Sequence, residues 1–309
     1  MVASAVAAVA AYSHPFARLG WVAWPMAFVA HLLVLRRHEA PGSRPQYWLH
    51  AAGLWLFAAL GTWEVGWAID HLVRGRAVWP LIAFALVPGA LLALLALREP
   101  RLGWPVAAHR DAYLVADSAP LAVFLALWAF LVNFVSNGDP SPLPYVPILN
   151  PLDLAVLGAP LVIALWFVEG RRLAIPAFAI GTPAAGYGLC AAAAFVWVNA
   201  VLLRALHHFA GVPFDLERML RSDLVQTSFS ILWTLIALAT MVLATRRGLR
   251  AAWLAGGGLL LVVVAKLFVV DLSNVGTVAR IVSFIGVGLL MLVVGYFSPV
   301  PPKVSEEPR

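Results

Sequence analysis

The chain is built from apolar runs about as long as a lipid bilayer is thick. A helix needs ~20 mostly apolar residues to cross ~30 Å of hydrocarbon. The runs that meet this description are 16–35, 48–70, 77–97, 117–136, 152–169, 184–206, 224–245, 250–270 and 278–297. The sequence therefore predicts an all-α fold, a polytopic transmembrane bundle of about nine spanning helices that form a single transmembrane domain over residues 1–309.

Composition excludes several other classes of protein. Apolar residues make up 62% of the chain and charged residues only 12%, whereas soluble domains carry about 25% charge. The single cysteine, Cys190, excludes an intramolecular disulfide and a multi-cysteine metal site. The arginines are scattered over short loops and form no stripe, which argues against nucleic-acid binding. We expect a lipid bilayer as the partner, and neither a cofactor nor a metal.

The arginines also predict which way the chain is threaded. Loops on the cytoplasmic side of a membrane protein are enriched in Arg and Lys. The loops that hold Arg36, Arg98, Arg171 and Arg246 alternate with loops that hold fewer positive charges, and residues 137–151 hold none. This pattern predicts a cytoplasmic C-terminus and an outward-facing loop at 136–152, whose five prolines favour an ordered, extended cap over a helix. In the outer loop 207–223 we expect a short interfacial helix from Phe214, with Asp215 near its start.

Glu64 is the carboxylate that lies deepest within a predicted span. Trp67 and His71 follow at spacings of three and seven residues and share its helical face. Ionisable groups inside a membrane are costly and usually functional. This group could therefore be a proton relay or a cation site; the alternative is a neutral Glu that is hydrogen-bonded to a neighbouring helix.

A polar stripe runs along the predicted span 224–245. Its members fall on one helical face and are Asp223, Gln226, Ser230 and Thr234. The stripe could face a water-filled cleft, or it could hydrogen-bond to a neighbouring helix. Asn133 and Asn199 are single polar groups within predicted spans, and we expect them to be structural, through hydrogen bonds between helices.

His207 and His208 are adjacent near the predicted outer face. Neighbouring residues on a helix point apart, so the pair does not predict a zinc site. It could serve acid–base chemistry or lie solvated at the interface. Together with Asp153, these groups predict a polar pocket on the outer face. We expect its lining to be Glu64, His71, Asp153, His207, Gln226 and Ser230.

The stretch 265–302 contains three charges around a short polar turn. Lys266 ends one apolar run, Asp271 follows five residues later, and Arg280 enters the next run. A helical hairpin would bring the three together at the outer interface. The cluster could be a structural ion network, or it could bind an anionic group such as a phosphate.

This last stretch, KLFVVDLSNVGTVARIVSFIGVGLLMLVVGYFSPVPP, resembles the C-terminal part of a bacterial membrane family named domain of unknown function 2339. LPYVPILNPLDLA (143–155), LHHFAGVPF with Arg204 before it, and SDLVQTSFSILWT (222–234) are similar to the same family. The resemblance covers 143–302. It implies a bacterial inner-membrane location and no established activity. Family members are typically longer, so the apolar residues 1–15 could be the remnant of an upstream helix.

Three functions remain open on the sequence. The first is transport or flipping of an envelope component through a periplasmic-facing polar pocket. The second is a membrane enzyme that acts on a lipid-linked glycan or lipid at that face. The third is a structural or assembly subunit that binds other membrane proteins or further copies of itself. The sequence contains no Walker loop, GxSxG motif or dinucleotide fingerprint to decide among them.

Overall fold

A computed structural model describes residues 13–39, 44–73, 78–98, 101–179 and 183–271, together with Ile285 and Gly288. Every regular element in this part of the chain is a helix. The chain divides into two compact units, Met1–His208 (unit 1) and Phe209–Arg309 (unit 2).

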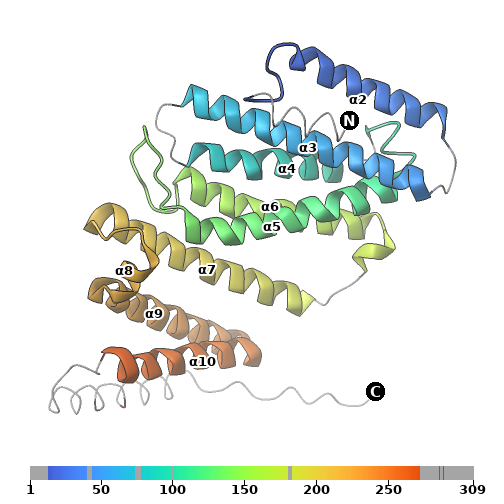
Figure 1. Cartoon of the computed structure of the whole chain (residues 1–309). Helices are drawn as coiled ribbons and strands as arrows, with labels where there is room; N and C mark the ends of the chain where they lie inside the picture. The colour runs from blue at the N-terminus through green and yellow to red at the C-terminus, as the bar shows by residue number, and fades with distance from the viewer. Residues whose placement is uncertain are drawn as a thin grey trace, which may run out of the picture. The chain divides into compact units, whose positions relative to one another are not determined.

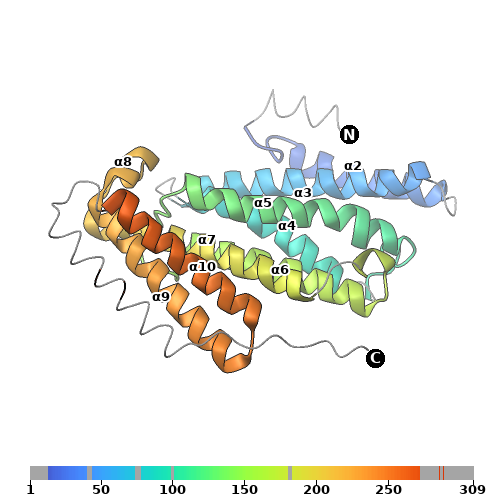
Figure 2. The ribbon, with the colours of Figure 1, turned by 90° about the horizontal axis from the view of Figure 1, so that it is seen from below.

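Unit 1 is a bundle of long helices joined by short connections (Figures 1 and 2). Its elements are α2 (Gly20–Arg37), α3 (Arg44–Leu72), α4 (Trp79–Arg98), the π-helical turn η2 (Ala112–Asp117), α5 (Ser118–Val135), α6 (Pro151–Arg172), the 3-10 turn η3 (Pro176–Phe178) and α7 (Pro183–Ala210). Helix α4 packs against α3, α5 and α6. Its buried face, with Leu92 fully buried, contacts Leu125 of α5 and Ala159 of α6 within one apolar cluster.

The two ends of unit 1 differ in chemistry. We call one the basic end, because it holds the arginines Arg36, Arg37, Arg98, Arg101, Arg110, Arg171 and Arg172. The other is the cap end, where the irregular segment 136–150, the cap loop, connects α5 to α6. The cap loop is non-helical, as its prolines predict. Asn150 caps α6 by accepting a hydrogen bond from the Leu152 amide at 2.8 Å, and Pro151 occupies the first helical position.

Unit 2 contains a short helix and a helical hairpin. Helix α8 (Leu216–Arg221) lies where the sequence predicts a short helix, and the Asp215 side chain caps it by accepting from the Arg218 amide at 3.0 Å. Helices α9 (Asp223–Arg247) and α10 (Arg250–Lys266) follow, with the π-helical turn η4 (Leu267–Asp271) at the end. Gly248, at φ +65°, ends α9 in the left-handed conformation that glycine adopts without steric cost.

The all-helical membrane fold is confirmed. Among the described residues, seven helices are long and apolar enough to cross a bilayer: Pro45–Leu72, Trp79–Arg98, Ala112–Val135, Pro151–Arg172, Ala185–Ala210, Asp223–Arg247 and Arg250–Val269. The predicted span 16–35 is a helix, α2, but it is not among these seven. The predicted span 278–297 lies outside the described residues, apart from Ile285 and Gly288.

The hairpin of unit 2 depends on a close contact at Gly256. A Cβ atom there would lie 2.8 Å from Met241 Cγ and 3.0 Å from the Ala237 carbonyl oxygen, so α9 would have to shift. We expect Gly256→Val to destabilise the protein by about 1–3 kcal/mol, the usual cost of overpacking. The measurement is the melting temperature of the purified protein in detergent.

Gly258 provides the matched control for this substitution. It lies two residues further along α10, is exposed, and has no atom within 4 Å of the position its Cβ would take. Gly258→Val should therefore melt close to the wild type. Equal melting temperatures for the two variants would contradict the close helix contact.

Candidate functional site

A buried ion pair lies at the cap end of unit 1. The Arg204 guanidinium of α7 contacts the Asp153 carboxylate in the first turn of α6, and both side chains have 0% exposure. Arg204 also donates to Asn133 Oδ1 of α5 at 3.0 Å and to the Ser136 carbonyl oxygen at 3.3 Å. One side chain thus joins three helices and the start of the cap loop.

The cap loop is held against this pair by close contacts. Asn150 Nδ2 donates to the Gly138 carbonyl oxygen at 2.7 Å, which closes the loop upon itself. Gly138 has φ +71°, and a Cβ atom there would lie 2.6 Å from Asn150 Nδ2 and 2.9 Å from Arg204 Cδ. Glycine is therefore required by both the backbone conformation and the space. The Val78 amide donates to the Asp139 carbonyl oxygen at 3.1 Å, which ties the loop to the residue before α4.

Aromatic and imidazole groups surround the ion pair on the cap. The Tyr145 ring stacks on His208 with ring centres 4.0 Å apart. His208 Nε2 donates to the Asn137 carbonyl oxygen at 3.0 Å, and His207 Nε2 lies 3.3 Å from Asn137 Nδ2. Burial, aided by the nearby Asp153, raises the pKa of Tyr145 to about 12, so its phenol is neutral at physiological pH.

Asp139 is the ionised group of the cap loop. Its carboxylate accepts from the Ser141 hydroxyl at 2.7 Å and from the Ser141 amide at 3.0 Å. The hydroxyl contact is the main reason that the pKa of Asp139 lies below its ordinary value, and the two histidines contribute to the lowering. The cap loop therefore supplies a carboxylate, Asp139, and a phenol, Tyr145. The end of α7 supplies two imidazoles, His207 and His208.

Glu64 of α3 is bound by the residues that precede α2. Its carboxylate accepts from His14 Nδ1 at 3.0 Å and from the Phe16 amide at 2.9 Å. The His14 ring stacks on Trp67 at 3.6 Å, and Trp67 contacts His71 at 4.1 Å. The side chains of Glu64 and His14 are 17% and 14% exposed, so this pair is partly open to its surroundings.

In unit 2 the polar stripe of α9 receives Lys266 of α10. Lys266 Nζ donates to Ser230 Oγ at 2.8 Å and to the Gln226 carbonyl oxygen at 3.0 Å. Thr234 donates its hydroxyl to the Ser230 carbonyl oxygen at 2.7 Å. Of the predicted anion-binding group only the Lys266 side chain lies within the described residues; the side chain of Asp271 and the whole of Arg280 lie outside them. The sequence did not predict that Lys266 contacts the stripe.

The six residues of the predicted polar pocket belong to both units. Glu64 and His71 are joined through Trp67, and Asp153 and His207 lie around the cap loop in the same unit. Gln226 and Ser230 lie on the α9 stripe of unit 2. Among the described residues no group of three or more His, Cys, Asp or Glu side chains could hold a metal ion.

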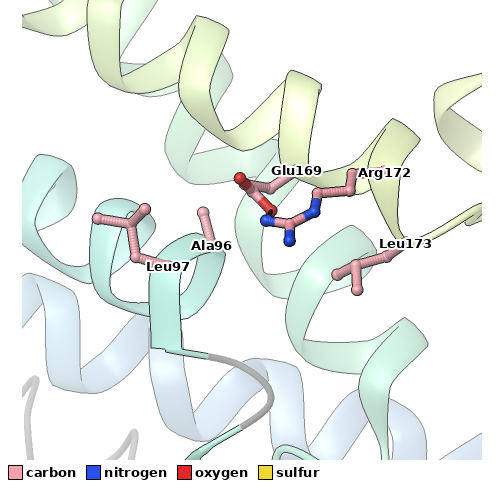
Figure 3. A pocket seen from close by; sticks show the side chains of 5 residues that line it. All are labelled: Ala96, Leu97, Glu169, Arg172 and Leu173. Carbon is pink, nitrogen blue, oxygen red and sulfur yellow. Dashed lines mark hydrogen bonds and ion pairs between the residues drawn. The ribbon is translucent and has the colours of Figure 1, made fainter.

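A small pocket in unit 1 lies at the opposite end from the cap. Its volume is about 230 Å³, and it is lined by Ala96, Leu97, Glu169, Arg172 and Leu173. Figure 3 shows the side chains of Glu169 and Arg172 directed toward each other from α6, with a nitrogen–oxygen distance of 3.4 Å. The pocket is thus bordered by a salt bridge at the basic end and contains none of the predicted site residues.

Sequence reasoning missed the partner of Asp153. The sequence singles out Arg204 only as the residue that precedes the family-like stretch LHHFAGVPF. The available signal was its position inside the predicted span 184–206, because an ionisable residue within a span usually pairs with another. His14 was missed because a contact across 50 residues has no sequence signal.

The family comparison agrees with the pattern of spans. A family model described as "Predicted membrane protein (DUF2339)" matches residues 1–301. The chain belongs to this family. The match extends the resemblance first seen over 143–302 into the N-terminal half of this DUF2339 protein. Curated proteins and solved structures gave no match.

The ion pair predicts a large loss of stability when one charge is removed. Arg204→Met leaves Asp153 buried without its counter-charge, which typically costs about 3–5 kcal/mol. The double variant Arg204→Met/Asp153→Leu leaves neither charge buried and should recover much of the lost stability. The melting temperature in detergent measures both effects.

Arg221 gives the control for loss of an arginine. It pairs with Glu217 at 2.7 Å in α8, but both side chains are more than 70% exposed. Arg221→Met should therefore change the melting temperature little. The assignment is wrong if Arg204→Met melts like Arg221→Met, or if the double variant is less stable than Arg204→Met alone.

Proposed function

We propose that this DUF2339 protein transports or flips an envelope component in the bacterial inner membrane, and that the cap end faces the periplasm. The observation that carries the proposal is the placement of ionisable groups at one end of the spans of unit 1. Glu64, Asp153 and Arg204 come from three different helices and all lie there. Such groups are costly inside a bilayer, and they either pair with one another or mark substrate or ion pathways.

The ionisable groups at the cap end have two roles, positioning of the cap loop and contact with a ligand. Arg204 and Asp153 are fully buried, so they position the cap loop and do not reach a ligand. Glu64, His14 and His207 are only partly buried. They are therefore the side chains we assign to contact with a polar head group.

Each alternative function is favoured by one observation. The Glu64–His14 pair, at 3.0 Å, is the carboxylate–imidazole arrangement that a hydrolytic membrane enzyme would need. A structural or assembly subunit is favoured because Arg204 and Lys266 are both bound by neighbouring protein groups. These two functions are the alternative outcomes of the following test.

The test is lipid movement in reconstituted vesicles. The purified chain is inserted into vesicles of phosphatidylethanolamine and phosphatidylglycerol that contain phosphatidylglycerol labelled with the fluorophore nitrobenzoxadiazole. Dithionite quenches only the outer leaflet of sealed vesicles. If the protein flips lipid, the inner-leaflet fluorescence should also disappear, and Glu64→Gln should slow this loss.

Glu169→Gln is the matched control, because it neutralises a partly exposed carboxylate at the basic end. It should leave the rate unchanged. A labelled cleavage product on a thin-layer plate would favour the enzyme instead. An inner leaflet that stays protected with no product formed would contradict transport of lipid and favour the assembly role.

The proposed membrane sidedness rests on the arginines of the basic end. Because positive loops stay in the cytoplasm, alkaline phosphatase fused after Pro144 in the cap loop should be active, and the same fusion after Ala174 near the basic end should be inactive. The alkaline phosphatase activity of bacterial cells that carry each fusion measures this sidedness. The reverse pattern would contradict the periplasmic cap and the cytoplasmic C-terminus together.

A further inference from the structure

Polar side chains at the basic end of unit 1 form a line from the surface to a buried carboxyl group. Glu39, 34% exposed, accepts a hydrogen bond from His109 Nε2 at 2.9 Å. The His109 ring lies against His50 with ring centres 4.4 Å apart. His50 Nδ1 is 2.9 Å from the Tyr113 hydroxyl oxygen, and both side chains are buried.

Asp117 is the buried end of this line. It has 0% exposure, and neither of its carboxylate oxygens has a hydrogen-bond partner in the described part of the chain. Trp55 donates at 3.2 Å to its main-chain carbonyl oxygen and not to the carboxylate. A carboxyl group in this setting needs either a proton or a donor.

The local backbone places Tyr113 next to Asp117. Both lie in η2, four residues apart, which is about one turn of a π-helix. The Ser118 hydroxyl donates to the Tyr113 carbonyl oxygen at 2.7 Å and holds the end of this turn. The four-residue spacing places Tyr113 and Asp117 on one side of the turn. A π-helical turn within a long helix is frequent at functional sites.

His50 also has a polar atom that its surroundings do not use. Its Nε2 is buried and has no hydrogen-bond partner among the described residues. An imidazole whose Nδ1 contacts Tyr113 and whose Nε2 has no partner among the described residues can accept a proton at Nε2 and release one from Nδ1. This is the property that a relay residue needs.

We propose that Asp117 is a proton-binding site that exchanges protons with the basic end through His50 and Tyr113. A proton from the His109–Glu39 pair binds His50 Nε2, while the proton on Nδ1 moves to the Tyr113 oxygen. The phenol passes its own proton to the Asp117 carboxylate. His50 and Tyr113 end neutral, and Asp117 gains one proton. His50 returns to its first tautomer when Nε2 releases its proton to water and Nδ1 accepts one from water.

Two steps of this path need an extra movement. The Asp117 carboxylate has no hydrogen-bond partner in the described part of the chain, so transfer from Tyr113 requires a side-chain rotation or one water molecule. The rings of His109 and His50 are tilted against each other and not hydrogen-bonded, so transfer between them requires one water molecule or the rotation of a ring. His109 is partly exposed, at 20%, which places it within reach of water.

Other titratable groups also face this site. They are His31 of α2, which acts on His50; Tyr47 of α3, which lies near Asp117 and donates to the Asp111 carbonyl oxygen; and Asp111 itself. Any titration of Asp117 is therefore measured against variants of these neighbours.

Proton binding at Asp117 does not require the proposed function. Only a coupling of this proton binding to transport would rest on the proposed function.

The test is infrared difference spectroscopy of the full chain in lipid nanodiscs. A protonated carboxyl group gives a separate C=O band, which shifts when its proton is replaced by deuterium. We expect such a band that disappears in Asp117→Asn and moves in Asp117→Glu. In Tyr113→Phe the band should remain, but its shift after transfer to D₂O should be at least ~10-fold slower, because the relay is broken.

Tyr187→Phe is the control, since it makes the same chemical change at an exposed position on α7. It should leave the exchange rate unchanged. The proposal fails if no carboxyl band depends on Asp117 across the range in which histidine titrates, or if Tyr113→Phe exchanges as fast as the control. Asp117→Glu keeps the carboxyl group and Tyr113→Phe keeps the ring, so these two variants answer the question if Asp117→Asn does not fold. Lipid flipping in vesicles is a separate measurement, so the two proposals can fail independently.

Discussion

The cap end of unit 1 depends on one charge pair in an apolar setting. Arg204 reaches from α7 to Asp153 of α6, Asn133 of α5 and the main chain of Ser136. Moving two charges out of water is expensive, and their attraction offsets the cost only when the remaining hydrogen-bonding positions are also satisfied. The contacts to Asn133 and Ser136, with the one to Asp153, give each guanidinium nitrogen a partner, whereas Oδ2 of Asp153 has none among the described residues. They also fix where α5 ends and the cap loop begins.

Several features around the pair follow from this constraint. Gly138 must be glycine because Arg204 and Asn150 occupy the space of its Cβ atom. Asn150 both closes the loop and starts α6, so the helix that supplies Asp153 begins where the loop requires it. Tyr145 is then stacked on His208, one turn beyond Arg204 on α7. The pair is therefore a scaffold, and chemistry with a ligand falls to the partly exposed groups around it.

The helices were predictable from sequence, and most of the contacts between them were not. Spans are recognised by length and hydropathy, which are local properties, and the prolines of 136–152 and the Asp215 cap are equally local. The spacing also placed Glu64, Trp67 and His71 on one face. The partners of Glu64 and Asp153 come from 50 and 51 residues away, and only the tertiary fold brings them together. Asp117 was missed because the sequence does not show which of several polar residues near a span end is left without a partner.

The account rests on Arg204 holding the cap loop in place. Amide hydrogen exchange, followed by mass spectrometry in detergent, compares the wild-type protein with Arg204→Met under conditions where both are folded. We predict that the amides of 136–153 exchange faster in the variant, while those of Ala112–Asp117 at the basic end keep their protection. Equal protection of the cap loop in both proteins would contradict the account, because the loop would then be held by something other than the ion pair.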